Sequence, residues 1–186
     1  MSQPAPEHQT RFEVAMVLFT VVIFIGTLAL NELLFATLEF GPGINWIYLP
    51  AGVRLLALLL FAEAGAVGIL LASWIVCFFW LFPDDYLRSF VGGIVAAAAP
   101  YLCYRGAQAW FGIKPSLANL TPRRLLLCAI AYSLASPLLH HLWFAMHGDD
   151  VDLLQGLGAM FAGDLAGTLI VLYAAKALLT LGRRKR

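Results

Sequence analysis

Six apolar stretches of about twenty residues dominate this chain, and each is long enough to cross the hydrocarbon core of a bilayer as a helix. Of the 186 residues, 61% are hydrophobic and only 12% are charged, a composition that excludes an ordinary soluble domain. We therefore predict an all-α integral membrane protein, a bundle of six transmembrane helices. The expected spans are approximately 13–37, 46–62, 65–82, 89–111, 124–146 and 154–179.

The basic residues predict the orientation, because cytoplasmic loops carry an excess of Lys and Arg. With six spans, both termini lie on the same side, and that side collects ten of the twelve basic residues, whereas the opposite side has only Arg88. Both termini are therefore expected in the cytoplasm, in a bacterial inner membrane. Residues 1–12 form a cytoplasmic tail in this scheme, 13–182 the membrane domain, and 183–186 a basic cytoplasmic tail that contacts anionic lipid.

Arg54 is expected inside the membrane, about nine residues into an apolar segment. At 1.5 Å per residue this is roughly 13 Å deep. Asp164 lies about 16 Å from the same side by the same rise. A charged side chain at this depth is costly and is a functional-site hypothesis by default, so we expect each residue to need the other as a counter-charge.

The neighbours of Asp164 predict a packed inner helix face. Gly167 and Thr168 follow Asp164 by three and four residues, which places them on its side of the helix. Gly163 and Gly167 form a small-xxx-small pair that permits close helix approach.

Pro50 predicts a helix start within the second apolar segment, with the residues before it extended or re-entrant. Free N–H groups at that start, close to Gly52 and Arg54, would form a site for a small anion or carboxylate. The alternative is a proline-kinked helix in which Arg54 pairs with Asp164 for packing alone. The sequence leaves both open.

Catalytic, metal and cofactor sites are not expected. His140, His141 and His147 precede several aspartates, but their spacing matches no closed zinc pattern, and a solvated cluster at the outer face is the simpler interpretation. No nucleotide motif or catalytic pair is evident, so we predict no enzyme, no cofactor and no nucleic-acid partner.

Four short motifs resemble the bacterial membrane-associated sensor domain of the first type, over roughly residues 40–180. They are Trp46-x-x-x-Pro50-Ala51-Gly52-Val53, Gly65-x-x-Gly68, Leu120-Thr121-Pro122-Arg123-Arg124 and Gly163-Asp164-Leu165-Ala166-Gly167-Thr168-Leu169. Members of that family usually precede histidine kinases or cyclic-di-nucleotide enzymes and are thought to detect a small signal within the bundle. This chain carries Arg54 where an apolar or small residue is expected in that family, and we expect no output domain after the membrane bundle.

The resemblance and the buried charges together imply a non-catalytic membrane sensor or ligand-binding module. It would bind a small, anionic molecule near Arg54 and Asp164 and act through a separate signalling or transport partner protein. Two alternatives stay open, namely a substrate-binding membrane subunit of a transporter, and a small structural or assembly subunit of a membrane complex.

Overall fold

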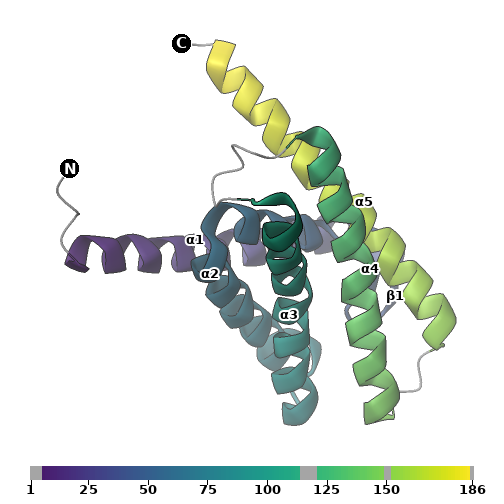
Figure 1. Cartoon of the computed structure of the whole chain (residues 1–186). Coiled ribbons are helices and arrows are strands. Elements are labelled where there is room, and N and C mark those ends of the chain that lie inside the picture. The colour runs from purple at the N-terminus through teal and green to yellow at the C-terminus, as the bar shows by residue number, and fades with distance from the viewer. Residues whose placement is uncertain (1–5, 114–120, 149–151, 185–186) are drawn as a thin grey trace.

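The computed structural model describes residues 6–113, 121–148 and 152–184, without the side chains of 6–8, 176 and 178–184. The described chain is almost entirely helical (Figure 1). Its elements are α1 (Pro6–Phe35), η1 (Ala36–Leu38), β1 (Glu39–Gly41), β2 (Ile44–Asn45), α2 (Leu49–Val76), the π-helical η2 (Cys77–Leu81), α3 (Tyr86–Phe111), α4 (Pro122–His147) and α5 (Leu153–Arg184).

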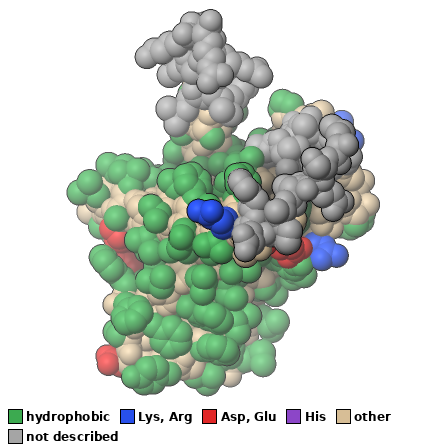
Figure 2. Space-filling model, turned by 90° about the vertical axis from the view of Figure 1, so that its left-hand side faces the viewer, with side chains coloured by type: hydrophobic (Ala, Val, Ile, Leu, Met, Phe, Trp, Pro, Cys, Tyr) green, Lys and Arg blue, Asp and Glu red, His purple; other side chains and the backbone are tan. Residues whose placement is uncertain are grey.

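Five helical segments of the described chain are long and apolar enough to cross a membrane, judged by length and composition. They are Gln9–Leu38, Leu49–Leu81, Tyr86–Phe111, Pro122–His147 and Leu153–Ala175. Figure 2 shows one face of the molecule with hydrophobic side chains over most of it. Leu33, Phe79 and Trp110 each expose more than four-fifths of their surface, as expected of side chains that face lipid rather than water. The predicted class is therefore confirmed in its coarser form, an all-helical chain with several helices long and apolar enough to cross a membrane.

Polar caps set the ends of the later helices. The side chain of Asp85 accepts a hydrogen bond from the Arg88 N–H at 2.9 Å at the start of α3. Thr121 does the same for α4, and Asp152 accepts from Leu154 and Gln155 at the start of α5. The left-handed glycine Gly112 follows α3, and Gly148 follows α4. These caps satisfy backbone groups that have no partner within the helix.

The predicted second and third spans form a single element, α2 with η2, that is broken at Ala62. Ala62 has φ 49° and ψ −121°, which no helix allows. Gly65 then packs against the carbonyl of Ala57, eight residues earlier, which a straight helix would hold far away. A Cβ built on Gly43, before α2, would lie 3.5 Å from Leu81 at the end of η2. Both ends of the element therefore lie at the same end of the molecule.

The helices pack in sequence order around α2. Helix α1 packs on α2, α2 contacts α3 and α5, and α4 lies between α3 and α5. In Figure 1, α3 and α4 run side by side, α5 crosses diagonally beside α4, and α1 lies across the others with its N-terminal part beyond the bundle. This arrangement brings the first turns of α2 close to α5, and the two buried charges lie where these helices meet.

Candidate functional site

Arg54 lies in the first half of α2 and is 6% exposed. Its guanidinium carbon lies 5.2 Å from the ring centre of Phe24 on α1 and 5.3 Å from that of Tyr48, distances typical of cation–π contacts. One terminal nitrogen donates to the Tyr48 hydroxyl at 3.5 Å. The Nε of Arg54 is buried and has no hydrogen-bond partner among the described residues. The cation is thus stabilised by aromatic rings, and part of its hydrogen-bonding capacity is unused.

Asp164 on α5 is 1% exposed. The Ser136 hydroxyl is close enough for a polar interaction with its carboxylate, but neither carboxylate oxygen accepts a hydrogen bond of good geometry from a described residue. Asp164 interacts electrostatically with Arg54 and lies beside Ser136 of α4. The direct pair that the sequence suggested is not formed, since the carboxylate accepts no hydrogen bond from the guanidinium. An unpartnered buried carboxylate is costly, so this arrangement leaves a demand for a further polar group.

The three predicted glycines allow close contact between α5 and the start of α2. A Cβ on Gly163 would collide with the carbonyl of Asn45, and one on Gly167 with the carbonyl of Tyr48. Gly52 is similarly tight against Val171 of α5. Gly163 and Gly167 therefore allow the non-helical residues before α2, and the first residue of α2 itself, to pack closely on α5. The Tyr48 N–H donates to the Gly163 carbonyl at 3.1 Å and fixes that segment in place.

The start of α2 corrects the prediction of an anion site built on free N–H groups. The helix begins at Leu49, with Pro50 in its first turn, as expected. The Leu49 N–H donates to Oδ1 of Asn31 at 2.8 Å, Pro50 has no N–H, and the Ala51 N–H donates to the Tyr48 carbonyl at 3.1 Å. These donors are occupied, so Arg54 rather than the helix terminus is the available anion-binding group.

Asn31 is a functional neighbour that the sequence did not reveal. It is fully buried, and its Oδ1 accepts the hydrogen bond from the Leu49 N–H that fixes the start of α2. The only sequence signal was a polar residue within an apolar helix. The backbone group that this side chain contacts depends on how α1 packs across α2, which a sequence pattern does not specify.

Buried hydroxyls surround the two charges. Thr168, predicted as part of the site, is fully buried on α5, one turn beyond Asp164. From α4, Tyr132 lies beside Arg54 and Ser136 beside Asp164. The hydroxyls of all three residues, and that of Ser133, lack a partner with hydrogen-bond geometry in the described chain.

The histidines of α4 do not form the solvated cluster that we expected. His141 is buried, and His140 is half-buried with its Nδ1 2.8 Å from the Ser136 carbonyl. Only His147 lies near the end of the helix, 3.6 Å from Asp85. Two of the aspartates that follow the histidines, Asp149 and Asp150, lie outside the described residues. His140 and His141 are shielded from solvent because α4 packs against α5 and α2.

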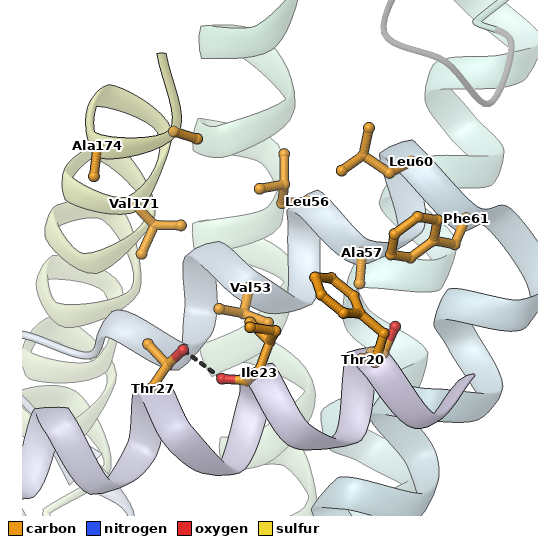
Figure 3. A pocket seen from close by; sticks show the side chains of 12 residues that line it. Thr20, Ile23, Thr27, Val53, Leu56, Ala57, Leu60, Phe61, Val171 and Ala174 are labelled. Carbon is orange, nitrogen blue, oxygen red and sulfur yellow. Dashed lines mark hydrogen bonds between the residues drawn. The ribbon is translucent and has the colours of Figure 1, made fainter. Parts of the chain in front are cut away.

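Two cavities flank this polar core. One, of about 240 Å³, lies between α1, α2 and α5 and is lined by apolar side chains such as Val53, Leu56 and Val171 (Figure 3). Its two threonines, Thr20 and Thr27, donate to carbonyls of their own helix. The second cavity, of about 280 Å³, lies near the β1–β2 hairpin and is lined in part by Arg88, Phe144 and Asp152.

The fold and site define an all-helical membrane protein with a buried, incompletely satisfied polar core. Comparison of the chain with protein-family models, with curated proteins and with solved structures gave no match. The resemblance to the membrane-associated sensor domain therefore stays a prediction.

Proposed function

We propose that this protein is a non-catalytic membrane sensor, a module that binds a small molecule between α2, α4 and α5 and acts through a separate partner protein. The observation that carries the proposal is the unpartnered carboxylate of Asp164 next to the unpartnered Nε of Arg54. Buried polar groups without partners cost about 1–3 kcal/mol each, so they persist where water or a ligand completes them. Intramembrane ionisable residues of this kind commonly mark ligand or ion sites.

The chemistry of the core favours a ligand with two different polar groups. An anionic group such as a carboxylate would accept from Nε of Arg54, while a donor or cationic group would pair with Asp164. A simple anion would satisfy Arg54 but leave Asp164 without a donor. The hydroxyls of Tyr132, Ser136 and Thr168 both donate and accept, and so would orient either end.

The proposed topology has six membrane segments, both termini in the cytoplasm and the hairpin break at Ala62 on the cytoplasmic side. The two limbs of α2 would enter and return, and the first limb, Leu49–Phe61, is about 20 Å long. That length is short of a 30 Å hydrocarbon core, so the non-helical Trp46–Tyr48 would contribute to the crossing. The bacterial inner membrane fits the sharp excess of basic residues on one side.

Signal output would follow from the position of the site between helices. A ligand that bridges Arg54 and Asp164 would tie α2 to α5, and α5 continues through Arg184 into the basic tail. A change in that contact would alter how the cytoplasmic end of α5 is presented to a partner protein. Such coupling requires that the ligand bind the two arrangements with different affinity.

Native mass spectrometry of the detergent-purified chain tests the proposal. We expect a small bound molecule on the wild type that is lost in Arg54→Ala. The matched control is Arg123→Ala, which removes an exposed arginine at the start of α4 and should retain the molecule. A wild type that carries no ligand and folds as well as Arg54→Ala would contradict the proposal and favour a structural subunit.

A further inference from the structure

The second cavity, which we call the outer cavity because the proposed topology places it on the side opposite the cytoplasm, shares Ile44 and Phe144 with a buried apolar cluster. Its wall is formed by residues of the β1–β2 hairpin region, by Arg88 and Asp152, and by Phe144 of α4. The polar lining distinguishes it from the apolar cavity beside α1, where no hydroxyl is turned towards the space. Water-soluble molecules are therefore suited to the outer cavity.

This small apolar cluster, which we call the plug, adjoins the cavity. Ile44, Phe144, Ala159 and Met160 form a buried cluster of their own, apart from the main hydrophobic core. Phe144 lines the cavity and its ring centre lies 6.1 Å from that of His140. Met160 lies one turn before Asp164 on α5. Phe144 is thus the plug residue of α4 that lines the cavity. On α5, Met160 is the plug residue one turn from Asp164.

A polar stripe on α4 continues inward from the plug. Tyr132, Ser136 and His140 are spaced four residues apart, and His147 follows seven residues later, so all four share one face of the helix. His140 contacts the Ser136 carbonyl and interacts electrostatically with Arg54. Further inward the same face carries the buried, apolar Ala129. The stripe therefore connects the core to the outer end and stops before the cytoplasmic end.

We propose that the outer cavity is the entrance through which a small, water-borne solute with both an anionic and a hydrogen-donating group reaches Arg54 and Asp164, with Phe144 as the barrier. This inference rests on the proposed function for the identity of the solute as a ligand. It adds the side of entry and the residue that controls access. A lipid-borne ligand would instead need a path between helices through apolar side chains.

Labelling with a charged, membrane-impermeant thiol reagent, sulfonatoethyl methanethiosulfonate, tests the route in the full chain. The background has Cys77, Cys103 and Cys128 replaced by alanine. In right-side-out vesicles, Ser136→Cys and His140→Cys should react with reagent added outside. The controls Leu134→Cys and Leu138→Cys, whose leucines are exposed on the opposite face of α4, should not react because a thiol in lipid does not ionise.

Phe144→Ala tests the barrier. It should speed labelling of Ser136→Cys several-fold, whereas Leu28→Ala, which also truncates a buried apolar side chain but on α1, should leave the rate unchanged. Size-exclusion profiles matching the background chain confirm folding of each variant. A folded Ser136→Cys that stays unlabelled, or that reacts only with reagent on the cytoplasmic side, would overturn the route. Labelling needs no bound ligand, so this failure is distinct from a negative result in native mass spectrometry.

Discussion

Ala62 holds a backbone conformation that a side chain disfavours. Among the described residues it is the only non-glycine with a positive φ. Its φ of 49° and ψ of −121° match the first central position of a type II′ turn, where glycine predominates. Sparsely populated conformations of this kind cost about 1–3 kcal/mol and persist only when the surroundings enforce them. Here the close packing of Gly65 on Ala57 enforces the reversal.

Replacement of Ala62 by glycine should therefore stabilise the chain by about 1 kcal/mol, since glycine adopts positive φ without steric cost. The measurement is thermal unfolding in detergent. Ala66→Gly is the matched control, because Ala66 lies in the helix after the turn and glycine there should destabilise by about 1 kcal/mol. Equal losses for the two variants would show that Ala62 is not strained.

The sequence predicted which site residues are buried, but it did not predict which groups they contact. Arg54, Asp164 and Thr168 are buried as expected, because charge and position in an apolar segment are local properties. The absence of a direct ion pair and the occupied donors at the start of α2 were not predictable. Both depend on where Asn31, Tyr48 and Ser136 arrive from other elements.

At the scale of elements, α2 with η2 has the least ordinary geometry. From Leu49 to Leu81 it would extend about 50 Å if straight, far beyond a 30 Å hydrocarbon core. The break at Ala62 folds it into two antiparallel limbs, and the contact between Gly43 and Leu81 returns the chain to its starting end. In the proposed topology each limb crosses the membrane, so this reversal is what makes the number of membrane segments even.

Sidedness labelling tests the reversal. Pro42→Cys and Asp84→Cys, which flank the element, should both react with an impermeant thiol reagent from the outside. Glu63→Cys, next to the break and exposed, should react only from the cytoplasmic side. If α2 crossed the membrane once, Pro42→Cys and Asp84→Cys would instead react from opposite sides.

Hydropathy predicted the existence of the helices better than their ends. The helix α1 begins at Pro6 and α5 reaches Arg184, both beyond the apolar stretches, because a helix continues into polar flanks until a cap or glycine ends it. The β1–β2 hairpin was not predicted, since strands of two or three residues leave no periodic pattern. The break at Ala62 agrees with the interruption expected between the spans 46–62 and 65–82, where the charged Glu63 divides the apolar run.

Across the whole molecule, polar contacts gather at two opposite ends with the buried charges between them. The outer cavity joins residues near β1, the start of α3 and the start of α5. At the other end, Tyr101 donates to Glu63 at 3.2 Å and accepts from Arg105 at 3.0 Å, which links the hairpin turn to α3. The core charges thus lie on α2 and α5, which between them contact α1, α3 and α4.

Removal of the two charges together should therefore be less harmful than the sum of the single removals. Arg54→Met or Asp164→Leu alone leaves one charge buried without its counterpart, which typically costs about 3–5 kcal/mol. In the double variant neither charge is left, so we expect a favourable coupling of about 1–3 kcal/mol in thermal or denaturant unfolding. As a control, Arg105→Met combined with Arg54→Met should be additive, because Arg105 is exposed on α3 and bonds only to Tyr101 among the described residues. Additive losses for Arg54→Met and Asp164→Leu would mean that the two charges do not interact. Each charge would then need its own partner within the membrane.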